Sequence, residues 1–290
     1  MERLTLYAAT ARRSVRRHGI RPHRALGALH PAMVFVVGCP RSGTTFTAGA
    51  IGSVPGYFDL GEVNRLKAAV PDLYGAFRAG LDDEVTGELR RVLRRTQRVA
   101  FAAGRRAVEQ TPEATFLIGP LSRAFPAAQF VHLVRDGRDV VASLMERGWL
   151  APDHGGVDDA GLPVGRYARF WVESDRAREF EESTEVRRCA WAWRRYESTA
   201  ASELARLDPA RVVHVRYEEL AAAPADVAAR VGETLGGAPA AAFVRAFSGM
   251  HAASVGRHAR VLTPAQVAEV RTEVGDLLQD LGYGGPHPVG

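Results

Sequence analysis

Short apolar runs alternate with longer amphipathic segments along this chain. The runs are rich in strand-forming side chains, are bounded by turn-forming or charged residues, and lie at residues 34–37, 57–60, 130–133 and 212–215. Segments of helical pattern follow them. Because strands that alternate with helices normally pair in parallel, the pattern predicts an α/β fold in which helices cover both faces of a central parallel sheet.

The predicted helices carry end signals. Residues 82–106 and 185–207 are helical in composition, and the aromatic side chains of the second segment are more typical of a core than of a cofactor site. Pro224 stands where a proline opens a helix. Thr263-Pro264-Ala265-Gln266 has the form of a capping box, and we expect the helix that it starts to end near Gly282.

The first apolar run leads into a loop bounded by Gly38 and Gly43. Loops that bind nucleoside triphosphates have this glycine spacing, followed by a lysine that reaches the terminal phosphates. Here Thr44 stands in the place of that lysine, and the nearby cation is Arg41, inside the loop. No apolar run ends in an aspartate suited to hold magnesium. The loop therefore predicts a metal-free site for a nucleotide whose terminal group is not a triphosphate.

A second turn offers similar groups. Arg135 follows the run at residues 130–133, and Ser143 lies eight residues further on, in the helix expected there. Ligands of α/β sheets bind outside the carboxyl ends of the strands. Both turns are therefore expected to present arginine, hydroxyl and helix N–H groups to the same face of the molecule.

With these motifs the chain resembles the sulfotransferases that use 3′-phosphoadenosine 5′-phosphosulfate (PAPS), over nearly all of residues 33–283. The phosphosulfate loop of that family is similar to Gly38-Cys39-Pro40-Arg41-Ser42-Gly43-Thr44-Thr45, in the arginine form found in tyrosylprotein and many bacterial members. The resemblance implies a P-loop-NTPase-like domain that takes PAPS as co-substrate and needs no metal.

The resemblance also assigns residues to the rest of the donor. Arg135 and Ser143 match the pair that holds the 3′-phosphate. Tyr217, within Val215-Arg216-Tyr217-Glu218-Glu219-Leu220, matches the tyrosine that contacts adenine. Arg257 ends a stretch, Ser254-Val255-Gly256-Arg257, that resembles the late loop near the 3′-phosphate.

Sulfuryl transfer requires in-line positioning, stabilisation of the anionic leaving group and removal of a proton from the acceptor. Arg41 and the loop N–H groups are expected to stabilise the leaving phosphate. Glu62 is the expected general base, because its distance after Arg41 resembles that of the catalytic glutamate in tyrosylprotein sulfotransferases. The alternative for Glu62 is a surface residue that caps a helix, and His132, within a predicted strand, is the rival base.

Glu109-Gln110-Thr111-Pro112 departs from the Glu-Lys-Thr-Pro element of the family. The family's lysine bridges toward the transferring sulfuryl group, and Gln110 donates a hydrogen bond without charge. Three explanations remain open: Arg41 suffices, another arginine such as Arg257 reaches the site, or transfer is weak.

Composition bears on organisation and partners. The 290 residues suit one sulfotransferase domain, at 31–290, after a basic leader at 1–30 that we interpret as a membrane-surface or acidic-partner helix, or as a solvated terminus. The net charge of +5 comes with arginine at every basic position except Lys67, which indicates codon bias and not a nucleic-acid partner. Two cysteines, no apolar stretch long enough to span a membrane and no signal peptide predict a cytoplasmic enzyme.

Three functions remain at this stage. The first is a sulfotransferase for a small-molecule, glycan or lipid acceptor, with the acceptor contacted by residues 65–74 and 150–171. The second is a kinase or other nucleotide-dependent enzyme, which the missing loop lysine disfavours. The third is a silent relative that binds 3′-phosphoadenosine nucleotides without transfer. The oligomeric state is left open.

Overall fold

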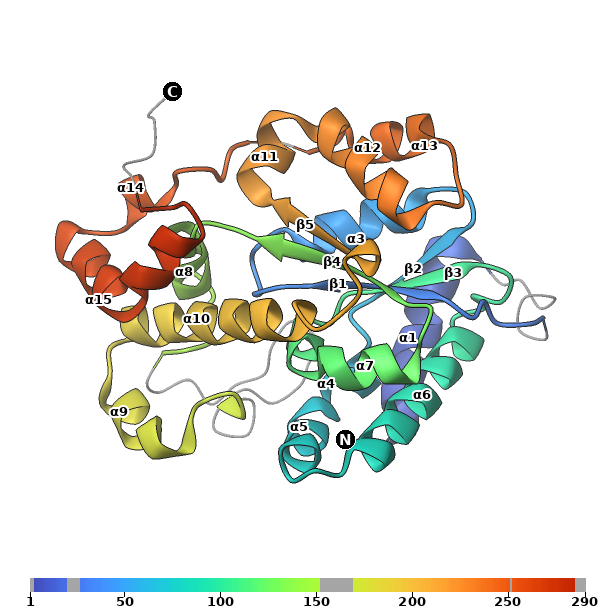
Figure 1. Ribbon diagram of the computed structural model, residues 1–290, viewed down its shortest axis with the longest axis horizontal. Coiled ribbons are helices and arrows are strands. Elements are labelled where there is room, and N and C mark those ends of the chain that lie inside the picture. Colours follow the sequence, from blue (N-terminus) through green and yellow to red (C-terminus); the bar gives the residue numbers. More distant parts are fainter. Residues whose placement is uncertain (1–2, 20–26, 152–168, 251, 285–290) are drawn as a thin grey trace.

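A five-stranded sheet organises the computed structural model, which describes residues 3–19, 27–151, 169–250 and 252–284 (Figure 1). The strands are β1 (Met33–Val37), β2 (Tyr57–Gly61), β3 (Arg106–Glu109), β4 (Gln129–Val134) and β5 (Val212–Arg216). They lie in the order β2-β3-β1-β4-β5, and every neighbouring pair is parallel. The predicted parallel α/β sheet is confirmed.

Helices cover both faces of the sheet, and short connections join them (Figure 1). The α-helices are α1 (Arg3–His18), α3 (Thr44–Ser53), α4 (Asn64–Lys67), α5 (Val70–Arg78), α6 (Asp82–Val99), α7 (Ile118–Ala124), α8 (Gly137–Met145), α9 (Ala177–Glu182), α10 (Glu185–Leu204), α11 (Tyr217–Ala222), α12 (Pro224–Leu235), α13 (Ala240–Phe247), α14 (His258–Val261) and α15 (Pro264–Asp280). The 3₁₀ helices are η1 (Pro112–Leu117), η3 (Ser174–Arg176) and η4 (Pro209–Arg211).

Alternation along β1 shows how the two faces are filled. Val34 and Val36 pack with α3, α12 and α13, whereas Met33, Phe35 and Val37 pack with α5, α6 and α7 on the other face. All five side chains are buried, as expected for a central strand of a parallel sheet. A third apolar cluster joins α8, α10 and α15 and extends the core toward the C-terminus.

The prediction of one helix over residues 82–106 is wrong at its end. Helix α6 stops at Val99, and β3 begins at Arg106. Phe101 and Gly104 have positive φ angles of 58° and 71°, which end the helix and turn the chain into the sheet. Helix α10 likewise ends at Leu204, three residues earlier than expected. The capping box of α15 is confirmed, with both of its hydrogen bonds present.

The basic N-terminal helix is packed against the body of the protein. Leu6, Tyr7 and Ser14 of α1 are buried, and α1 lies against α4 and α6. Arg13 donates from Nη1 to the carbonyl oxygen of Glu62 at 2.7 Å. Helix α1 therefore holds the end of β2 in place.

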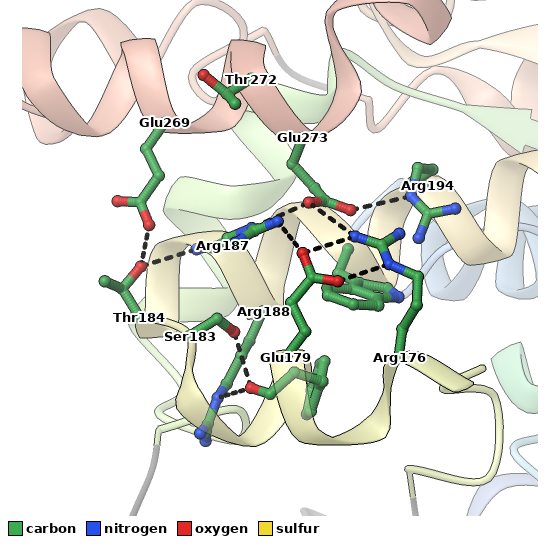
Figure 2. A network of polar contacts seen from close by, with 12 residues as sticks. Arg176, Glu179, Ser183, Thr184, Arg187, Arg188, Arg194, Glu269, Thr272 and Glu273 are labelled. Carbon is green, nitrogen blue, oxygen red and sulfur yellow. Dashed lines mark hydrogen bonds and ion pairs between the residues drawn. The ribbon is translucent and has the colours of Figure 1, made fainter. Parts of the chain in front are cut away.

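A network of arginine and glutamate side chains fixes α15 to α10 and α9 (Figure 2). Glu273 of α15 is 4% exposed at its side chain and accepts at 3.1 Å from Nε of both Arg187 and Arg194. Arg176 lies over the ring of Trp191 at 3.8 Å and pairs with Glu179 at 2.8 Å. Such shared, partly buried pairs stabilise more than isolated surface pairs do.

Candidate functional site

All five strands end at the same edge of the sheet, and each end carries a residue singled out from the sequence. Glu62 follows β2 and Gln110 follows β3. The Gly38–Gly43 loop follows β1, Arg135 follows β4 and Tyr217 follows β5. The carboxyl edge of a parallel sheet is where ligands bind in such folds.

The loop after β1 is built to surround an anion. Gly38, Arg41 and Gly43 have φ angles of 141°, 73° and 94°, so the chain turns tightly back on itself. A Cβ atom on Gly38 would lie 2.3 Å from the carbonyl oxygen of Leu133, which requires glycine there. The N–H of Ser42 donates to the carbonyl of Cys39 at 3.2 Å. The N–H groups left to face an anion are therefore those of Gly43 and of the first residues of α3, Thr44 and Thr45.

Arg41, Arg135 and Ser143 meet beside this loop. Nε of Arg41 donates to Oγ of Ser143 at 3.0 Å, and Nη1 of Arg135 donates to the carbonyl of Arg41 at 3.0 Å. Arg135 lies over the ring of Tyr217 at 4.3 Å, and the same ring closes over Gly43, where an added Cβ would lie at 2.8 Å. Two guanidinium groups, a hydroxyl and an aromatic face thus line one site.

Buried polar atoms at the site are left without partners in the described part of the chain. Oγ of Ser42 and Nε of Arg135 are both buried and have no hydrogen-bond partner there. Burying such groups unpaired costs about 1–3 kcal/mol each. Their chemistry, a hydroxyl and a guanidinium N–H, fits the oxygens of a phosphate or sulfate group.

Asp139 in the first turn of α8 fastens the late loop to the site. It accepts from the N–H groups of Gly256 and His258 at 2.8 Å each, and its carboxylate lies 2.7 Å from Nδ1 of His258. Nη2 of Arg135 donates to the carbonyl of Ser254. Burial alone would raise the pKa of Asp139, but the hydrogen bonds from His258 and the charge of Arg135 together lower it.

Arg257 stands on this loop and forms an ion pair with Glu146, the residue after α8. Ser143 lies one turn before Glu146, so this pair places Arg257 near the part of the site that contains Arg135 and Ser143. Its pairing with Glu146 does not favour the idea that Arg257 replaces the charge missing at Gln110.

Glu62 lies at the other end of the sheet, directly after the edge strand β2. Its carboxylate is 30% exposed and pairs with Nζ of Lys67 at 3.0 Å. Lys67 also pairs with Glu113 of η1, at 3.5 Å. The N–H of Val63 donates to Oγ1 of Thr111 at 3.0 Å, which ties the end of β2 to the end of β3.

Glu109 and Gln110 lie at the end of β3, the strand next to β2. Burial raises the pKa of Glu109 to about 8, although hydrogen bonds from the side chain and N–H of Thr111 lower it; the charge of Glu62 adds to the rise. Glu109 is therefore protonated at neutral pH. Gln110 is 3% exposed, and its Oε1 has no partner among the described residues.

The rival base has a different role. His132 is 4% exposed and lies 3.1 Å from Oε2 of Glu197 in α10 and 3.1 Å from Nδ1 of His214. Its ring therefore faces α10 and the edge strand β5, which speaks against proton transfer at the loop. Burial strongly raises the pKa of Cys39, so it is a thiol in the core and not a nucleophile.

Two residues of the site carry no signal in the sequence that points to their role. Lys67 stands out there only as the sole lysine, and Asp139 only as part of a helix start. The predicted acceptor segment at residues 150–171 lies mostly outside the described residues. At the described end of that segment, Trp171 is buried in the core. In the other predicted segment, 65–74, Tyr74 packs edge-on against Phe116 and Phe170, with ring centroids 5.6 and 5.4 Å apart.

Two further observations concern metals and membranes. The described residues contain no group of three or more His, Cys, Asp and Glu side chains placed to hold a metal ion. None of the helices in the described ranges combines the length and hydrophobicity needed to cross a bilayer.

Two comparisons with known proteins, one with family models and one with solved structures, gave matches to sulfotransferases. The model of the sulfotransferase family matches residues 31–238. The sulfotransferase domain from the curacin biosynthetic pathway has a TM-score of 0.52 at 16% identity, covering 89% of this chain and 100% of that one. Sulfotransferase STF9 from Mycobacterium avium has a TM-score of 0.53 at 15% identity, covering 93% of this chain and 81% of that one. Mouse sulfotransferase SULT7A1, solved as a complex with PAP (adenosine 3′,5′-bisphosphate), has a TM-score of 0.50 at 15% identity, covering 89% of each chain. No curated protein matches the chain.

Proposed function

Because the chain belongs to the sulfotransferase family, we propose that it moves a sulfuryl group from PAPS to a hydroxyl or amine of a small-molecule, glycan or lipid acceptor. One observation carries this proposal. Arg41, Arg135, Ser143 and Tyr217, from four separate elements, meet around the glycine loop at the carboxyl edge of the sheet.

The charges of the site fit the two anionic ends of this donor. We assign the 5′-phosphosulfate to the loop N–H groups and Arg41, and the 3′-phosphate to Arg135, Ser143 and Arg257. Tyr217 offers its ring to adenine. The unpaired Oγ of Ser42 and Nε of Arg135 support an anion with several oxygens in this place. The mouse sulfotransferase of similar fold was solved as a complex with PAP, which is consistent with such a ligand.

Transfer then requires one proton movement and one displacement. Glu62 takes the proton from the acceptor O–H or N–H as that atom attacks sulfur. A bond from the acceptor to sulfur forms, the bond from sulfur to the bridging 5′-phosphate oxygen breaks, and adenosine 3′,5′-bisphosphate (PAP) leaves with the electron pair. Arg41 stabilises the charge that develops on the leaving phosphate. The rest of the catalysis is positioning.

The silent relative stays as the second candidate because of one observation. Gln110 places a neutral, buried amide where the family has a lysine, and its Oε1 lacks a partner among the described residues. A kinase is disfavoured, because Thr44 replaces the loop lysine and is itself 3% exposed.

Calorimetry tests the donor assignment. PAP should bind, and ATP with magnesium should bind far more weakly. Arg135→Ala removes a charge-assisted contact worth about 1.5–3 kcal/mol and should weaken PAP by roughly ten- to a hundredfold. Arg91→Ala, at an arginine whose side chain is 64% exposed, is the matched control and should leave PAP affinity unchanged. Unaltered affinity in Arg135→Ala would remove this assignment.

Turnover separates the enzyme from the silent relative. Extracts incubated with protein and ³⁵S-labelled PAPS should yield a labelled product, identified by mass spectrometry as an acceptor heavier by one sulfo group. Protein that binds PAP but labels nothing in any extract would favour the silent relative.

A further inference from the structure

Lys67 is the one lysine of the chain; every other of the 38 Lys and Arg side chains is arginine. It lies at the end of α4, its side chain is 15% exposed, and it sits between two carboxylates. Nζ lies 3.0 Å from Oε2 of Glu62 and 3.5 Å from Oε1 of Glu113. The single lysine of the sequence is thus in direct contact with the candidate base.

Lysine and arginine differ in what they can do between two carboxylates. The ammonium is a compact charge with three donors on a flexible stem, so it can bond both carboxylates and shift between them. The guanidinium is a rigid, flat fork, and where it bridges two carboxylates in this chain, as Arg187 does between Glu179 and Glu273, separate nitrogens hold each one. The ammonium of Lys67 is instead a single compact charge that can move between its two carboxylates when one of them becomes neutral.

The surroundings of this cluster explain why a cation is needed there. Glu62 follows β2, Glu109 ends β3 and Glu113 lies in the first turn of η1, while Gln110, directly after β3, brings no charge. The raised pKa of Glu109 favours its neutral form, and the carboxylates that Lys67 contacts are those of Glu62 and Glu113. Arg13 of α1 also reaches this point of the chain, but it donates to the backbone oxygen of Glu62 and not to the carboxylate.

We propose that Lys67 is a positioning residue for transfer, which holds the carboxylate of Glu62 toward the acceptor and passes to Glu113 when Glu62 takes the proton. The inference rests on the proposed function. As Glu62 becomes neutral its attraction for the ammonium falls, and Glu113, already within 3.5 Å, keeps the charge paired. Lys67 thereby supplies a positive charge beside the candidate base, whereas Gln110, on the neighbouring strand end, supplies none.

The composition of the chain makes the contact directly observable. Protein grown with lysine labelled at ¹³Cε and ¹⁵Nζ gives one side-chain NMR signal, from Lys67. We expect Glu62→Gln and Glu113→Gln each to move this signal. Glu182→Gln, at a 64% exposed glutamate that pairs with Arg178, is the matched control and should leave it unmoved. A signal at the position of free lysine, indifferent to Glu62→Gln, overturns the proposal whether or not any transfer is found.

Single-turnover rates of ³⁵S transfer from PAPS to the acceptor identified in the extracts test whether Lys67 acts through Glu62. Lys67→Met should slow transfer by roughly ten- to a hundredfold with PAP affinity retained, and Lys67→Arg should recover part of the rate. In the Glu62→Gln background, Lys67→Met should slow transfer only slightly further, because the effects of residues that act as a unit do not add. An equal loss in both backgrounds refutes the role. Thermal unfolding of each variant checks that the fold is kept.

Discussion

Asp139 holds the late loop against the candidate donor site, and its removal should lower both the stability of the protein and its affinity for PAP. Its carboxylate is fully buried and accepts from the N–H of Gly256, the N–H of His258 and the ring of His258. Hydrogen bonds to a charged group are worth about 1.5–3 kcal/mol each. Gly256 is half-buried, so water can replace its contact, whereas the two contacts with the buried His258 are lost outright.

Two such contacts, allowing for relaxation, give a loss of about 2–4 kcal/mol for Asp139→Ala. If the whole domain unfolds as one unit, the melting temperature should fall by roughly 4–8 °C. PAP affinity should fall as well, by about ten- to a hundredfold, because Arg135 loses the ion pair at 3.7 Å and Ser254 and Arg257 are no longer held in place.

Calorimetry with PAP and thermal unfolding measure the two effects. Asp226→Ala, at an exposed aspartate of α12, is the control for Asp139→Ala and should change stability by less than about 0.5 kcal/mol. An Asp139→Ala protein that binds PAP as tightly as the wild type would refute the role of this carboxylate.

The same residue predicts a pH dependence. The pKa of Asp139 is lowered below its ordinary value of 3.8, so the charged form favours the folded state. This contribution is present above pH 3.8 and is lost as pH falls through the lower folded value. Asp139→Asn should therefore lose less stability than the wild type on acidification from about pH 5 to about pH 2.5, as measured by urea unfolding at each pH.

Four other changes test separate parts of the structure. Glu62→Gln should lower turnover about a hundredfold or more with PAP affinity retained, and full turnover would assign proton removal elsewhere. Gln110→Lys should be no faster than the wild type in single-turnover assays if Lys67 supplies the cation as we propose, and a tenfold gain would contradict this. Gly43→Ala should lower stability by about 1–3 kcal/mol in thermal unfolding through strain at φ 94° and contact with Tyr217, whereas Gly49→Ala, with open space around it, should not. Glu273→Gln should cost about 1–3 kcal/mol in urea unfolding because three arginines share this buried carboxylate, while the exposed Glu182→Gln should cost less than about 0.5 kcal/mol.

Local signals predicted the loop and four of the five strands. The loop could be predicted from its glycine spacing and Arg41, because its geometry is set by residues that are adjacent in the sequence. Strand β3 was missed, since Arg106 and Glu109 are charged ends of a strand only four residues long. Its apolar content is Ala107 and Val108 alone, which a helix tolerates equally well.

Long-range contacts were beyond such signals. The pairing of Lys67 with Glu113 and of Asp139 with His258 joins residues far apart in the chain, and neither spacing has a local signature. Glu62 was singled out through the resemblance, but its partner was not, because a lone lysine in a short helix is usually a solvated charge. The sequence suggested the types of residue at the strand ends; the order of the strands decided which of them touch.

The placement of site residues on all five strand ends has a consequence for folding and synthesis. The loop around Arg41 leaves the ribosome well before its partners Arg135, Ser143 and Tyr217, which lie roughly a hundred residues or more further along. Because β4 and β5 must both be in register before these groups meet, PAP binding should appear only late in refolding and should follow the recovery of helix signal. We expect a chain stopped before Tyr217 to carry the complete glycine loop and yet to bind no PAP.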